Sequence, residues 1–258
     1  MIRQYKLLSL LLLLVPASMF LALLSGSSNI GIKELLPVLS GGSDALTKTI
    51  FTLRVDRALD AFIIGALLSM AGALLQVLLR NPLAEPYILG ISGGAGAFTL
   101  AALLLGISLS WAPLTAFTGA LISTLLVFSI SFSNGKWTTE RLLLTGVVIA
   151  AGWGAVISFL LSISSQQQMQ GMLFWLMGDL SQANQTATGF FILPITFIAS
   201  WAIARPLNLL AHGEQQAAAL GENIKILRMM IFVLAAAMTA TAVSMAGSIG
   251  FVGLIIPH

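Results

Sequence analysis

The chain has 258 residues, of which 58% are hydrophobic and only 8% are charged, whereas a soluble domain carries about 25% charged residues. This composition excludes an ordinary water-soluble fold. It suits a chain that crosses lipid many times, because a charged side chain costs roughly 2.5–3.5 kcal/mol at the centre of a membrane-spanning helix. The formal net charge is +3, but the basic residues are scattered rather than gathered into one patch. We therefore expect a lipid bilayer, and not nucleic acid, as the partner of most of the surface.

Seven apolar stretches are long enough to be transmembrane helices, since about 20 helical residues cross a hydrocarbon core about 30 Å thick. They cover residues 7–24, 58–79, 87–105, 111–132, 142–163, 187–204 and 229–246. An eighth apolar run begins at Gly250, and the chain ends within it at His258. The sequence thus predicts an all-α polytopic membrane protein with about seven complete spans and the start of an eighth.

The basic residues also predict how the helices are oriented. The first stretch follows Arg3 and Lys6 and has the alternatives of a cleaved signal peptide and a signal anchor. We favour the anchor, because its apolar core is long and six more spans come after it. With a cytoplasmic N-terminus, the cytoplasmic side holds eight basic residues and the outer side four, as the positive-inside rule requires. The eight are Arg3, Lys6, Arg80, Lys136, Arg141, Arg205, Lys225 and Arg228, and the four are Lys33, Lys48, Arg54 and Arg57.

Two connecting segments are long. Residues 29–56 lie on the outer side and are expected to form a short surface helix and a turn. Residues 205–228 lie on the inner side and read as two short helices, which Gly213 separates and Gly221 ends.

Glycine and proline mark three further motifs. The string RNPLAEP at 80–86 predicts a tight turn, because Pro82 and Pro86 end helices. GISGGAGA at 90–97 resembles a phosphate loop but lacks the GK[ST] ending and follows no strand, so close helix packing explains it better. Gly146, Gly152 and Gly154 in the fifth stretch fit either close packing or a smooth wall for a large solute.

Chemistry-bearing residues are rare at membrane depth. No Asp, Glu, Lys or His occupies the middle of a predicted span, which argues against a proton- or sodium-driven carrier and against a membrane-embedded enzyme. The chain has no cysteine, and its two histidines, His212 and His258, are far apart in the sequence. We expect no metal site, no cofactor and no catalytic residue, with a secondary transporter or channel and a membrane enzyme as the alternatives to an energised transporter.

Four strings together resemble the permease family of type II ABC importers for cobalamin, iron-siderophore and haem complexes. They are RVDR at 54–57, RNPLAEPYILGISGGAGA at 80–97, RPLNLLAHGEQQAAALG at 205–221 and GSIGFVGLIIPH at 247–258. The resemblance implies about ten helices in one transmembrane domain, so residues 1–258 correspond to a domain that is incomplete at its C-terminus. It also implies an inner-membrane location, a homodimer with a second permease subunit, two cytoplasmic ATP-binding subunits that hydrolyse ATP, and a periplasmic substrate-binding protein. Ferric chelates are the favoured cargo because they are the commonest in the family.

The same resemblance assigns roles to particular residues. Arg54 and Arg57 would dock the binding protein, although Asp56 replaces a proline common in the family. The cytoplasmic gate would consist of Asn81, Leu83, Thr139 and Glu140, and Gly146, Gly152 and Gly154 would lie on a helix that lines the pathway. The segment 205–228 would couple to the ATPase through Leu209, Leu210, Gly213, Glu214, Ala217, Leu220 and Gly221, with His212 and Glu222 departing from the usual apolar residues.

Overall fold

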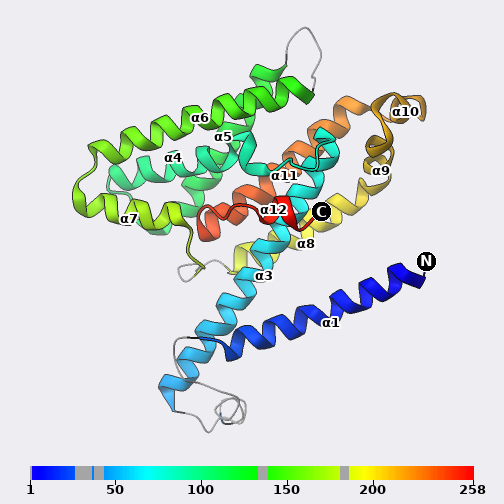
Figure 1. The fold of residues 1–258 in the computed structure, drawn as a ribbon. Helices are drawn as coiled ribbons and strands as arrows, with labels where there is room; N and C mark the ends of the chain where they lie inside the picture. The colour runs from blue at the N-terminus through cyan, green and yellow to red at the C-terminus, as the bar shows by residue number, and fades with distance from the viewer. Residues whose placement is uncertain (1, 27–36, 38–43, 133–138, 181–185) are drawn as a thin grey trace. The chain divides into compact units, whose positions relative to one another are not determined.

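The structure is a computed structural model that describes all residues except 1, 27–36, 38–43, 133–138 and 181–185. The described residues form helices and no strand (Figure 1). The α-helices are α1 (Ile2–Leu24), α3 (Ala45–Leu79), α4 (Ile91–Leu104), α5 (Ala112–Ser131), α6 (Thr139–Ile163), α7 (Gln166–Met177), α8 (Thr186–Ala202), α9 (Ala204–His212), α10 (Glu214–Ala219), α11 (Ile224–Ala246) and α12 (Val252–Ile255), with 3₁₀ turns η1 (Pro86–Leu89) and η2 (Leu109–Trp111). The all-α class is confirmed.

Each predicted span contains a helix, but the number that can cross a membrane is approximate. Among the residues that the structure describes, four helical segments are long and apolar enough, namely α3, η2 with α5, α6 and α11, and a fifth qualifies if α8 and α9, bent by 56°, count as one. The helix α4 has 14 residues, which is about 21 Å at 1.5 Å per residue. It is shorter than predicted because η1 and Gly90, whose φ is 71°, occupy the start of the expected span.

The chain divides into two compact units, Met1–Phe62 and Ile63–His258. The first contains α1 and the first half of α3, which begins at Ala45 rather than near residue 58. Part of the predicted outer connection is therefore helical, and the rest of it lies outside the described residues except for single positions. The prediction of one permease domain over residues 1–258 stays a prediction.

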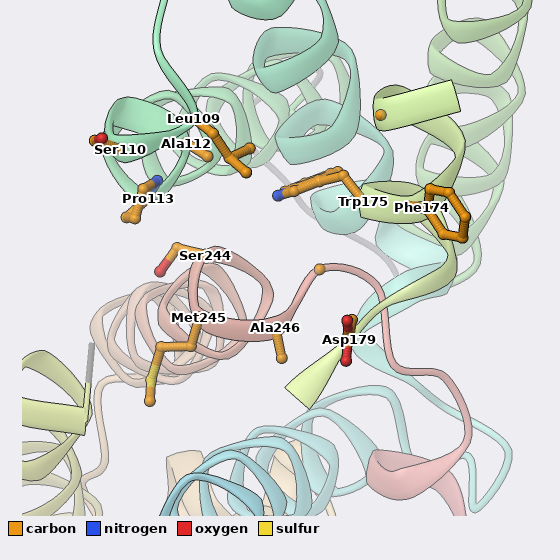
Figure 2. A pocket seen from close by; sticks show the side chains of 12 residues that line it. Leu109, Ser110, Ala112, Pro113, Phe174, Trp175, Asp179, Ser244, Met245 and Ala246 are labelled. Carbon is orange, nitrogen blue, oxygen red and sulfur yellow. The ribbon is translucent and has the colours of Figure 1, made fainter. Parts of the chain in front are cut away.

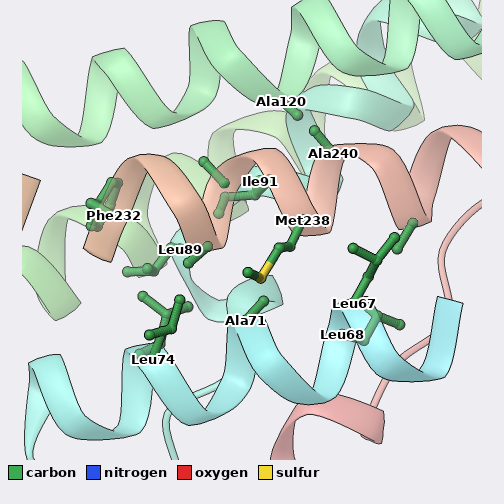
Figure 3. Close-up of a cluster of buried hydrophobic side chains, with 14 of the residues drawn as sticks. Leu67, Leu68, Ala71, Leu74, Leu89, Ile91, Ala120, Phe232, Met238 and Ala240 are labelled. Carbon is green, nitrogen blue, oxygen red and sulfur yellow. The ribbon is translucent and has the colours of Figure 1, made fainter. Parts of the chain in front are cut away.

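The core of the second unit lies between α3, α5 and α11 (Figure 3). Leu67, Leu68 and Leu74 of α3 point toward Phe232 and Met238 of α11, with Leu89 and Ile91 of the η1–α4 junction beside them. On its other side α11 packs against α5, where Ala120 and Ala240 are fully buried. A helix buried on several sides must be apolar all round, and α11 fits this description because 61% of its apolar window is buried.

The glycine-rich stretch packs α4 closely against α5 and α6, as predicted. A Cβ atom on Gly94 would lie 2.5 Å from the carbonyl oxygen of Gly119 in α5, and a Cβ on Gly93 would lie 2.9 Å from Trp153 Cβ in α6. Only glycine allows these helix backbones to approach so closely.

Candidate functional site

The first part of the candidate site is the turn that follows α3. Asn81 Oδ1 accepts a hydrogen bond of 2.9 Å from the backbone N–H of Leu83, and the N–H of Ala84 donates to the carbonyl of Asn81 at 3.0 Å. Asparagine commonly fixes a turn in this way. Leu83 stands on this turn with 66% of its surface exposed. The structure thus presents Leu83 outward on a fixed turn, as a gate residue requires.

The remaining positions predicted for the gate belong to the start of α6. Glu140 lies in its first turn and is exposed, and the side chain of Thr139 lies outside the described residues. α6 also contacts η1, which follows the Asn81 turn. Whether Glu140 and Leu83 act together stays a prediction.

Residues 80–90, the first part of the string at 80–97, meet the string at 247–258. Side chains of the first segment accept hydrogen bonds from backbone N–H groups of the second. Glu85 Oε1 accepts a hydrogen bond of 2.6 Å from the N–H of Phe251, and the Tyr87 hydroxyl accepts one of 2.7 Å from the N–H of Ile249. Phe251 has a φ of 68°, a conformation that bulky residues rarely adopt. Irregular backbone among membrane helices needs such partners, because lipid offers none.

A second set of contacts joins the 247–258 string to α3. Gln76 Nε2 donates to the carbonyls of Gly253 and Leu254 at 3.4 and 3.2 Å. A Cβ atom on Gly72 would collide with the carbonyl oxygen of Gly253. The strings at 80–97 and 247–258 therefore form one packed junction with α3.

The third string forms the two short helices that the sequence predicts. α9 ends at His212, Gly213 adopts φ 138° and ψ 142°, and α10 begins at Glu214. Glycine is needed at Gly213, because an L side chain is strained at this φ. The Arg80 guanidinium lies 3.9 Å from where a Cβ atom of Gly213 would be. The turn after α3 and the α9–α10 break are thus neighbours.

A hollow of about 430 Å³ lies where these segments meet. Its lining combines Arg80, Asn81 and Pro82 of the turn with Ala211 of α9 and Pro257 of the last string, together with Ala73, Gln76 and Val77 of α3. Three of the four strings therefore converge around one space at one end of the helix bundle.

The structure separates the predicted coupling residues into two groups. Leu210 and Ala217 are 1% and 0% exposed, so they pack inside this chain and do not belong to an outward contact surface in this structure. Leu220 is 66% exposed, and Leu209 is partly exposed. Glu214 forms an ion pair with Arg228 of α11. Gly213 and Gly221, with φ of 138° and 89°, serve as the breaks before and after α10.

The glycines of α6 lie in different surroundings. Gly146 is buried, whereas Gly152 and Gly154 are exposed and a Cβ atom on either would meet nothing within 4 Å. Only 6% of the apolar window of α6 is buried. Of the two interpretations that the sequence left open, close packing within this chain does not apply to Gly152 and Gly154.

In the first unit, Arg54 and Arg57 differ although both belong to α3. Arg54 is partly buried and its Nη1 donates a 2.8 Å hydrogen bond to the carbonyl of Leu23 at the end of α1, where a cation suits the helix C-terminus. Arg57 is exposed. Arg57 is therefore the better placed of the two for a contact with another protein.

A separate pocket of about 240 Å³ lies between the start of α5, the end of α7 and the end of α11 (Figure 2). Leu109 and Trp175 project into it from opposite sides, and Asp179 lies at its edge below Trp175. The pocket is lined mainly by apolar atoms and carries one carboxylate. Of the residues that line it, Gly247 alone belongs to one of the four family strings.

Sequence reasoning missed several residues that build the site. Glu85 and Tyr87 stood in a recognised string, but only the fold shows that their partners lie more than 160 positions away. The helix α7 was also missed, although Ser165 and Gln168 form a capping box at its start, a pattern that is visible in the sequence.

Together the apolar helices and the convergent strings define an all-α polytopic membrane protein of the ABC importer permease fold. The sequence model of the FecCD transport family matches residues 11–258, and the chain therefore belongs to that family.

Individual proteins similar to this chain are also permease proteins of transport systems. The chain is 36% identical to the cobalamin import system permease protein BtuC of Halobacterium salinarum, over 86% of this chain and 61% of that protein. It is 37% identical to the hemin transport system permease protein HmuU of Yersinia pestis, over 84% of this chain and 67% of that protein. A solved metal-chelate type ABC transporter in an inward-facing conformation superposes with a TM-score of 0.87 at 29% identity, covering 98% of this chain and 80% of that one. The chain thus spans about three fifths of the length of the first of these relatives.

Proposed function

We propose that this chain is the membrane-spanning permease subunit of an ATP-driven importer for an iron-siderophore, cobalamin or haem complex. The observation that carries the proposal is the convergence of three family strings, at 80–97, 205–221 and 247–258, on one end of a bundle of apolar helices. One of these strings forms the short helix pair α9–α10, whose polar residues suit a water-exposed contact and not lipid. ATP hydrolysis would belong to a separate subunit.

In this proposal the N-terminus and the α9–α10 pair face the cytoplasm of a bacterial inner membrane. Two copies of the chain would enclose the pathway, and the exposed small residues Gly152 and Gly154 of α6 would form part of its wall. Leu83 and Asn81 would narrow the inner end, and Leu220 with Leu209 would contact the ATPase. The binding protein would dock on the opposite side, with Arg57 as the leading contact.

The proposal is tested by reconstituting the protein with its cognate ATPase and binding protein in vesicles. We expect uptake of a ferric siderophore, cobalamin or haem that requires ATP and is insensitive to ionophores. Uptake that an ion gradient drives without ATPase would instead support the secondary transporter.

The same preparation tests the proposed contact surfaces and the gate. Leu220→Asp should release the ATPase, and Arg57→Glu should release only the binding protein. Leu83→Ala should raise the leak of substrate. Wild-type behaviour of any of these variants would remove that residue from its role.

A further inference from the structure

Glu214 and Arg228 form an ion pair between α10 and α11, named below the α10–α11 ion pair. The Arg228 side chain is 11% exposed and that of Glu214 is 37% exposed, so both charges are partly removed from water. Removing one partner of such a pair leaves the other charge partly shielded from water and without this counterion. Arg228 had no role in the sequence analysis beyond helix orientation, and Glu214 was assigned to a surface for the ATPase.

The helix α10 depends on its neighbours for its position. It has six residues, far below the 12–15 that an isolated helix needs to be even marginally stable in water. Ala217 is fully buried, so one face of α10 packs against the rest of the chain. After the helix, the N–H of Glu222 donates a hydrogen bond of 3.1 Å to the carbonyl of Ala217. At its other end Gly213 leaves the backbone free to bend. The ion pair is therefore the charged link that fixes the start of α10.

Arg228 belongs to α11, which has the largest buried share among the long apolar helices that the structure describes. Arg228 follows the buried Leu227, and both lie near the N-terminal end of α11. α11 contacts α4, α5 and α8, and the segment after it makes the hydrogen bonds with Glu85 and Tyr87. A displacement of α10 that carried Arg228 with it would thus reach the centre of the unit.

We propose that Glu214 and Arg228 are positioning residues that transmit movement of α10 to α11, and that Glu214 faces its own chain instead of the ATPase. This inference rests on the proposed function, in which the ATPase holds the α9–α10 pair. It leaves Leu220 and Leu209 as the apolar contacts for the ATPase and assigns the carboxylate to the mechanical link behind them.

The test compares Glu214→Gln, Arg228→Gln and the exchanged pair Glu214→Arg with Arg228→Glu in the reconstituted importer. Each single variant should keep the ATPase bound and active but lower the substrate taken up per ATP hydrolysed by roughly threefold to tenfold. The exchanged pair should recover most of that loss, because it restores opposite charges at the two positions. The readout that separates transmission from a structural role is uptake per ATP while the ATPase stays bound and active. Unchanged uptake per ATP in either single variant overturns the inference. So does loss of the ATPase in Glu214→Gln with normal behaviour of Arg228→Gln, because Glu214 would then be a contact with the ATPase.

A second measurement does not depend on variants of the pair. Because the chain has no cysteine, spin labels can be placed on cysteines at the exposed positions Gln216 of α10 and Met230 of α11 without background labelling. The distance between the labels should stay the same with and without ATP, and a change would overturn the link. Failure of Leu220→Asp to affect the ATPase would instead count against the proposed contact surface, and absence of ATP-driven uptake in the wild type against the proposed function itself.

Discussion

The helices α4 and α6 have similar compositions, rich in glycine, alanine and bulky apolar residues. They differ in burial, because α4 is packed among other helices and α6 is largely exposed. In α4, Gly93 and Gly94 lie against the side chain of Trp153 and the backbone of Gly119. In α6, Gly152 and Gly154 face open space, and only a small share of the helix is buried. The same residue type therefore serves close packing in one helix and leaves an unoccupied surface in the next.

This difference shows what small residues can mean in a membrane protein. Where they face a neighbouring helix they shorten the distance between backbones. Where they face nothing in their own chain, they keep a wall smooth for whatever lies beyond it, which in the proposed function is the substrate pathway. Substitutions at matched glycines separate the two roles.

The largest effect on stability is expected at Gly94. In Gly94→Ala the new Cβ would lie 2.5 Å from Gly119 O and 2.6 Å from Ser123 Cβ, and overpacking of this kind costs about 3 kcal/mol. In Gly152→Ala the Cβ meets nothing, so the variant should be neutral or gain up to about 1 kcal/mol from helix propensity. Thermal unfolding in detergent measures both. Equal melting temperatures for the two variants would mean that the α4–α5 contact is looser than the structure has it.

A smaller effect, on transport alone, is expected from a large side chain on the open wall. Gly152→Leu should lower the rate of uptake severalfold at unchanged melting temperature, because the side chain would narrow the pathway without touching its own chain. Val156→Leu is the matched control, since Val156 is exposed on the same helix and already carries a branched side chain. If Gly152→Leu transports normally, α6 faces lipid or another protein and not the pathway.

Sequence reasoning established the fold class, because composition and the length of apolar stretches report directly on the cost of placing charge in lipid. It also located the α9–α10 pair, since Gly213 and Gly221 are local breaks. It could not decide the surroundings of Gly152, because periodicity does not say which face of a helix meets a neighbour. Nor could it find the partners of Glu85 and Tyr87, because the packing of distant segments brings the paired groups together. The partner of Glu214 is only 14 positions away, but the pairing depends on how α10 folds back on α11. Leu210 and Ala217 were assigned to an outward surface for the same reason.

The smallest expected effect concerns how α6 is attached. Trp153 Nε1 donates a 2.9 Å hydrogen bond to Ser123 Oγ in α5, and that hydroxyl donates at 2.7 Å to the carbonyl of Gly90. Trp153 also meets Phe98 of α4 edge to face, with ring centroids 6.0 Å apart. Trp153→Phe keeps an aromatic ring at this position, removes the N–H donor and replaces the indole by a smaller ring.

The hydrogen bond should account for about 0.6–1 kcal/mol of the cost of Trp153→Phe, since hydrogen bonds between membrane helices are worth little more than those in water. Ser123→Ala should cost more, because it removes both bonds and leaves the Gly90 carbonyl without this donor. In the double variant the hydrogen-bond part of the Trp153→Phe effect should disappear, because its acceptor is already gone, and only the cost of the smaller ring should remain. Thermal unfolding of the four proteins closes this cycle. Fully additive losses would show that the indole N–H does not hold α6 to α5, leaving the contacts of the glycine-rich stretch to attach the exposed helix.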